Sequence, residues 1–193
     1  MSRAVVDAER PPEGLTGDLQ TTGIAAVGLS LLLLRPLALG RPGAALTLGA
    51  TYLLLAAISF AGAVPQPGAA MTRPLLVLGV GAGAFTLSPL VSGTPIPFPV
   101  AQDALMLNTL AALAEEAFFR RYLFGRLASN GPAFAIVVSA LLFALVHVPA
   151  YGMAAFWVDL GAGLLLSWQR WASRRWTIPA ATHVLANVLA VAR

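Results

Sequence analysis

EEAFFR, residues 115–120, stands inside an apolar stretch that runs from Ala101 to Leu127, and this arrangement decides the fold. Charge is rare elsewhere in the chain, since 10% of the residues are Asp, Glu, Lys or Arg and 58% are hydrophobic. The only two histidines, His147 and His183, also stand in apolar stretches. Ionisable side chains inside membrane-spanning helices are costly unless they are paired, so this set indicates a functional site.

The composition is typical of a polytopic helical membrane protein. The mean hydropathy is +0.79, and several apolar runs approach the roughly 20 residues that one helical span needs. The net charge of +4 comes from arginine alone, and most arginines stand between apolar runs. This excess of positive charge therefore indicates how the spans are oriented in the membrane, rather than nucleic-acid binding. The absence of cysteine excludes disulfides, thiolate metal ligands and a cysteine nucleophile.

Helix breakers divide the chain into an all-α, polytopic transmembrane helical bundle of about six or seven spans. Residues 1–19 are rich in carboxylates and include two adjacent prolines, which predicts a flexible polar tail rather than a signal peptide. Residues 20–193 form a single predicted transmembrane domain, with its catalytic motifs in 101–190. The first span is interrupted by Arg35 and Pro36. We expect spans near residues 20–39, 43–63, 74–92, 101–127, 132–149, 152–169 and 177–192.

The arginines also predict an orientation in a cytoplasmic membrane. A cytoplasmic N-terminus places seven arginines on the cytoplasmic side and three, Arg35, Arg41 and Arg193, on the other. The positive-inside rule therefore favours a multi-pass protein with its N-terminus in the cytoplasm. The helix ends nearest the charged motifs lie on the arginine-rich side, so we expect a site that opens toward the cytoplasmic half. Small residues at Gly79 and Gly83, and at Gly161 and Gly163, are expected to permit close helix packing.

The charged positions fall into three helical pairs. Glu116 and Arg120 lie one turn apart on one helix face, whereas Glu115 is rotated by about 100° from Glu116. We therefore expect Arg120 to hold Glu116 and leave Glu115 to face another group. Phe143 and His147 share a face of the next predicted span. His183 and Asn187 share a face of the last one.

These residue types outline water-activated hydrolysis of an acyl group. A carboxylate and an imidazole can bind and deprotonate one water, while an imidazole and an amide can donate to the resulting oxyanion. Other peptidase designs are missing from the sequence, because it has no HExxH motif, no GxSxG elbow and no lysine or cysteine for a nucleophilic dyad.

At these residues the chain resembles the CPBP family of intramembrane proteases, which includes type II CaaX prenyl proteases and bacteriocin-processing or immunity homologues. The family motifs EExxxR, FxxxH and HxxxN read here as residues 115–120, 143–147 and 183–187. The resemblance covers roughly residues 100–190. It implies a peptide hydrolase in which Glu115 and His147 activate water and His183 and Asn187 stabilise the oxyanion. It also implies that Glu116, Arg120 and Phe143 support the site.

Several alternatives stay open at this point. Glu115, His147 and His183 are also a possible His₂Glu set for Zn²⁺, although we favour hydrolysis without an obligatory metal ion. Asp159 stands in the sixth span, where an apolar or small residue is expected. We favour a hydrogen bond from Asp159 to a neighbouring helix over a role in substrate binding or proton transfer. The competing functions are a non-catalytic membrane scaffold or immunity protein and a proton- or ion-handling transporter.

The expected partners are the lipid bilayer and a membrane-associated peptide or protein substrate. Prenylated CaaX tails and bacteriocin or self-immunity peptides are both compatible with the motifs, because these define the hydrolytic groups rather than the substrate pocket. No nucleic acid is expected. The transporter is the weaker alternative, since the chain shows no internal repeat with broken helices.

Overall fold

The computed structural model describes residues 13–62, 74–92 and 103–191, and the regular structure of these residues is entirely helical. The prediction of an all-α bundle is therefore confirmed. In chain order the elements are α1 (Glu13–Leu33), the 3₁₀ turn η1 (Arg35–Leu37), α2 (Ala44–Ala61), α3 (Pro74–Ser92), α4 (Asp103–Glu116), the π-helix η2 (Ala117–Leu123), α5 (Phe124–Leu127), the 3₁₀ turn η3 (Ala128–Asn130), α6 (Pro132–Tyr151), α7 (Met153–Ser173) and α8 (Thr177–Val191).

The helix boundaries follow the predicted breakers closely, and the clearest differences are in α1, α6 and α7. Helix α7 continues four residues beyond its predicted end at residue 169, to Ser173. Helix α1 begins at Glu13, seven residues before the predicted span, and residues 1–12 of the predicted tail lie outside the described residues. Helix α6 continues through Pro149 to Tyr151 and ends at Gly152, whose φ of 81° is readily adopted only by glycine. Arg35 and Pro36 interrupt the first span as predicted, since α1 ends at Leu33 and the short turn η1 begins at Arg35.

Three of the described helices are long and apolar enough to cross a membrane: Gln20–Leu37, Ala44–Ala61 and Pro132–Tyr151. Two shorter apolar segments, Pro74–Leu87 and Thr177–Ala190, add to this set. The bundle therefore has the character of a membrane protein.

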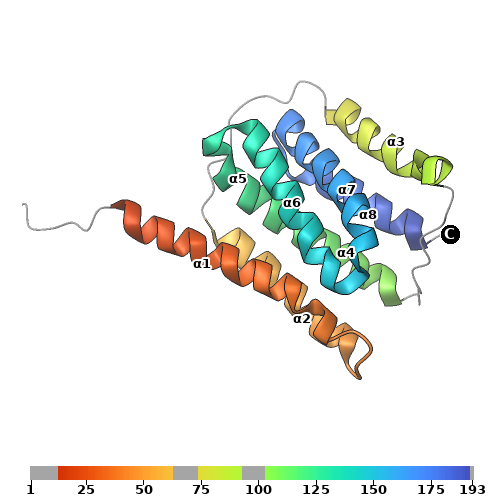
Figure 1. The fold of residues 1–193 in the computed structure, drawn as a ribbon, viewed down its shortest axis with the longest axis horizontal. Helices are drawn as coiled ribbons and strands as arrows, with labels where there is room; N and C mark the ends of the chain where they lie inside the picture. The colour runs from red at the N-terminus through yellow and green to blue at the C-terminus, as the bar shows by residue number, and fades with distance from the viewer. Residues whose placement is uncertain (1–12, 63–73, 93–102, 192–193) are drawn as a thin grey trace, which may run out of the picture.

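The helices pack around a central rod formed by α4, η2 and α5 (Figure 1). Helices α1 and α2 lie along one side of the bundle, and α3 lies on the opposite side against α7 and α8. Helices α6 and α7 form the most extensive pair. The core is aromatic where the rod meets its neighbours, with Phe118, Phe119 and Tyr122 fully buried.

Side-chain bonds tie the helix ends together at two levels. At one level, Gln169 of α7 donates to the carbonyl of Val77 in α3 (2.8 Å) and to Thr182 of α8 (3.0 Å). At the other, Asn187 near the end of α8 donates to the carbonyl of Asn108 near the start of α4 (3.0 Å). These contacts are expected when successive helices run in opposite directions through the bundle.

Glycine permits close helix packing, but at positions other than most of those predicted. A Cβ at Gly163 would lie 3.0 Å from Cα of Ala140, so α6 and α7 approach closely there. A Cβ at Gly161, Gly79 or Gly83 would meet nothing within 4 Å. The crowded position on α3 is Gly81, where a Cβ would collide with the side chain of Gln169.

Candidate active site

The two adjacent glutamates end α4, and the chain then widens into the π-helix η2. Both are buried, with Glu115 3% and Glu116 0% exposed. The wider turn is stabilised from outside, because Ser139 donates to the carbonyl of Phe119 (3.2 Å) and Arg170 donates to that of Arg120 (2.9 Å). Isolated π-turns of this kind are frequent at functional sites. This change in helix type is not predicted by the sequence.

Glu116 is held by two partners. Its Oε1 accepts from Nη1 of Arg120 (2.9 Å) and from Nδ1 of His183 (3.0 Å). Arg120 is itself fully buried and also donates to the carbonyl of Gly163 (3.2 Å). The structure thus pairs Glu116 with Arg120, as the spacing predicted, and adds His183 to that pair.

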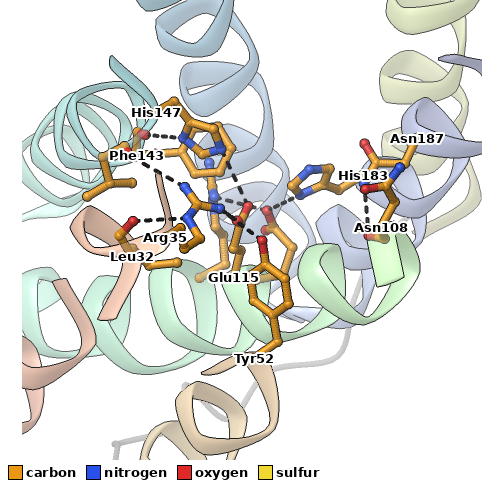
Figure 2. A network of polar contacts seen from close by, with 12 residues as sticks. Leu32, Arg35, Tyr52, Asn108, Glu115, Phe143, His147, His183 and Asn187 are labelled. Carbon is orange, nitrogen blue, oxygen red and sulfur yellow. Dashed lines mark hydrogen bonds and ion pairs between the residues drawn. The ribbon is translucent and has the colours of Figure 1, made fainter. Parts of the chain in front are cut away.

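Glu115 has a partner that sequence reasoning missed. Its Oε1 accepts from Nη1 of Arg35, a buried ion pair between η1 and α4. Figure 2 shows Arg35 and His147 on one side of Glu115 and His183 on the other. The topology prediction places Arg35 among the arginines on the non-cytoplasmic side of the membrane, whereas the structure buries its side chain, with 5% of its surface exposed. The sequence does indicate that such a partner is needed. If Glu116 pairs with Arg120, a second buried carboxylate requires another cation.

His147 faces the second oxygen of Glu115. Its Nδ1 lies 2.7 Å from the carbonyl of Phe143, and since a carbonyl only accepts, this nitrogen carries a proton. Its Nε2 lies 3.7 Å from Oε2 of Glu115. This distance is too long for a direct hydrogen bond and short enough for one water to contact both atoms. When this imidazole is neutral and the carboxylate is ionised, the two atoms that face each other are both acceptors.

Phe143 joins the two halves of the site. Its ring centroid lies 4.5 Å from that of His147 and 5.8 Å from that of His183, and the guanidinium of Arg120 lies 4.4 Å from its centre. Both imidazoles therefore pack against one buried ring, which also receives a cation–π contact. Tyr151 stacks on the outer side of His147, with its ring centroid 5.8 Å away and 51% of its surface exposed.

Asn187 and Asp159 lie near the site, but within the part of the chain that the structure describes no hydrogen bond joins either of them to Glu115 or to the histidines. The amide of Asn187 is bonded to the carbonyl of Asn108, so in this arrangement it ties α8 to α4 rather than turning to Glu115. Asp159 is partly buried in α7, within the electrostatic field of Glu115, His183 and Arg35. Its Oδ2 is buried and has no hydrogen-bond partner among the described residues. The neighbouring-helix bond expected for Asp159 is not seen for this oxygen.

The zinc set considered above, Glu115, His147 and His183, does not converge. Nδ1 of His183 is turned to Glu116, and the described residues contain no group of three His, Cys, Asp or Glu side chains arranged to hold a metal ion. Arg35 also places a positive charge directly on the carboxylate that zinc would need. These donors therefore do not fit a zinc site as they are arranged.

Comparison with known proteins gives one family. Residues 97–189 match the family described as type II CAAX prenyl endopeptidase Rce1-like, and they include the three motifs together with Phe143. No curated protein and no solved structure matches the chain. The family is one of proteases, and its match agrees with the CPBP resemblance of the motifs. Residues 97–189 are therefore similar to the Rce1-like type II CAAX prenyl endopeptidases, the family that the three motifs predicted.

Proposed function

We propose that this chain is an intramembrane endopeptidase that hydrolyses a peptide bond of a membrane-associated substrate. The observation that carries the proposal is the facing pair of acceptors, Oε2 of Glu115 and Nε2 of His147, 3.7 Å apart in a buried site. Two acceptors in that position favour a molecule that donates two hydrogens. Water is such a molecule.

The pair supplies a general base and an orienting group. A water between them directs one hydrogen to Glu115 and the other to His147, which leaves an oxygen lone pair for the substrate carbonyl carbon. As the C–O bond forms, one water proton passes to Glu115. The C–N bond then breaks, and that proton leaves with the amine product. Proton transfer by a positioned base contributes about 10²–10⁴-fold in rate.

His183 is the donor that we propose for the oxyanion. Its Nδ1–H is directed to Glu116, so Nε2 donates only when the ring carries both protons. Glu116 supplies the negative partner for that imidazolium. Asn187 stands one helical turn further along α8, and its role in the oxyanion site would require its amide to leave the carbonyl of Asn108. We therefore assign the main stabilising role to His183 and a supporting one to Asn187.

The substrate is proposed to be a peptide or protein at the membrane. Exposed leucines and valines lie on the outer faces of the described helices, which suits lipid contact, and the charged groups of the candidate site are buried inside the bundle. A multi-pass arrangement would bring the scissile bond to Glu115 within the bilayer. A prenylated CaaX tail and a bacteriocin-type or self-immunity peptide are the two substrate classes to be compared.

The test is hydrolysis by the purified full-length protein in proteoliposomes, comparing wild type with Glu115→Gln. The variant keeps the side-chain shape but removes the base, so the rate should fall by about 10²–10⁴-fold. Met106→Leu, which changes an 82% exposed residue of α4, is the matched control and should keep the wild-type rate. Membranes of cells that express Glu115→Gln should accumulate the uncleaved substrate.

Wild-type turnover by folded Glu115→Gln would contradict this mechanism. Absence of cleavage by the wild type on every peptide that accumulates with the variant would instead favour a non-catalytic scaffold.

A further inference from the structure

We infer that Arg35 is a positioning residue for the hydrolytic water site, and that η1 and α2 complete an active site whose family motifs all lie in residues 97–189. This inference rests on the proposed function. Arg35 precedes the matched region by about 60 residues in the chain, yet its guanidinium lies on the carboxylate of Glu115.

The guanidinium is held by bonds from three elements. Its Nε donates to the carbonyl of Leu32 in α1 (3.0 Å), its Nη2 to the carbonyl of Val146 in α6 (3.3 Å), and its Nη1 to the hydroxyl of Tyr52 in α2 (3.4 Å). Nη1 also makes the ion pair with Glu115 (Figure 2). Because four of its five N–H groups are directed to protein atoms, Arg35 is placed to act on Glu115 rather than on the substrate.

The ion pair gives the two carboxylate oxygens different tasks. Arg35 binds Oε1 of Glu115, and Oε2 is then the oxygen that faces Nε2 of His147. The bond from Arg35 to the carbonyl of Val146 fixes the same guanidinium to the residue directly before His147. Arg35 therefore sets the position of the base relative to the imidazole. Displacement of a catalytic group by about 1 Å costs on the order of 10²-fold in rate.

The positive charge also favours the ionised form of the base. An opposite charge in direct contact stabilises a carboxylate, so removing it should move the acidic limb of the pH–rate profile to higher pH. A neutral substitution at Arg35 leaves the other charged and titratable groups around Glu115 unchanged: Tyr52 of α2, Glu116 of α4, Arg120 of η2, His147 and Tyr151 of α6, Asp159 of α7 and His183 of α8.

The experiment compares full-length Arg35→Gln and Arg35→Lys with Arg41→Gln. Arg41 is an exposed arginine of the same turn region and makes the matched control. For Arg35→Gln we expect kcat to fall by about 10²-fold with little change in KM, and the acidic limb to move to higher pH. Arg35→Lys should recover part of kcat, because it restores the charge without the guanidinium geometry. Arg41→Gln should match the wild type.

A stability cycle keeps the inference testable if Arg35→Gln folds poorly. Removing one member of a buried pair leaves an uncompensated charge, whereas removing both does not. The double variant Arg35→Gln/Glu115→Gln should therefore unfold at a higher temperature in detergent than Arg35→Gln alone. A double variant no more stable than Arg35→Gln would overturn the pairing.

The two proposals fail differently. Wild-type kcat and an unshifted pH profile in Arg35→Gln, together with inactive Glu115→Gln, would overturn the role of Arg35 and leave the proposed hydrolysis intact. Activity retained by Glu115→Gln would remove the hydrolytic mechanism and, with it, the positioning role.

Discussion

At the level of single residues, two adjacent glutamates have different surroundings because a rotation of about 100° around the helix points them to different cations. Glu116 meets Arg120 on its own chain segment, and Glu115 meets Arg35 from the other end of the sequence. The first pair was predictable, since residues four apart on a helix are neighbours. The second was not, because helical spacing says nothing about which distant arginine reaches a given face.

The residue-level prediction concerns Glu116. Glu116→Gln should destabilise the protein strongly, since it leaves the fully buried Arg120 without its carboxylate. Breaking such a pair typically costs about 3–5 kcal/mol. The measurement is thermal unfolding in detergent, with Glu116→Gln/Arg120→Gln as the comparison, because the double variant leaves no lone charge. A melting temperature of Glu116→Gln equal to that of the wild type would contradict the assigned pairing.

At the level of elements, the sequence predicted where helices begin and end better than how they pack. Proline and glycine mark the boundaries. The structure follows the predicted boundary at Gly131–Pro132, whereas α6 continues through Pro149 and ends at Gly152. The site motifs could also be grouped from the sequence, since three spacings agreed with one family. The π-helix could not be predicted, because side chains of Ser139 and Arg170 on other helices satisfy its carbonyls. The glycines that face a neighbouring helix depend on helix rotation, which the sequence leaves open.

The element-level prediction uses two glycines of α7. Gly163→Val should destabilise the protein by about 1–3 kcal/mol, since the new side chain must displace the backbone of Ala140. It should also lower activity, because the carbonyl of Gly163 accepts from Arg120. Gly161→Val introduces the same residue into the same helix where a Cβ meets nothing within 4 Å, so it is the control. Equal melting temperatures of the two variants would contradict close packing of α6 and α7 at Gly163.

At the level of the whole molecule, the contacts place the site toward one end of the bundle. Arg35 lies two residues before the end of η1, and His147 lies four residues before the end of α6. The bond from Arg35 to Val146 brings these two ends together. With a cytoplasmic N-terminus, both ends would face the non-cytoplasmic side. This differs from the expectation of a site open to the cytoplasmic half, which was based on the arginine-rich helix ends.

Orientation can be tested directly, because the chain contains no cysteine and each introduced thiol is therefore the only one. Leu39→Cys changes an exposed residue after η1, and Ser129→Cys changes an exposed residue of η3. With a cytoplasmic N-terminus, a membrane-impermeant thiol reagent added to intact cells should label Leu39→Cys, and Ser129→Cys should react only after the membrane is opened. Leu39 lies four residues beyond Arg35, so its side of the membrane is the side nearest the site. The reverse labelling would show that the end of the bundle nearest the site faces the cytoplasm. The substrate would then be expected to enter from the cytoplasmic side. Labelling of both thiols from one side would contradict the alternating helix directions on which this topology depends.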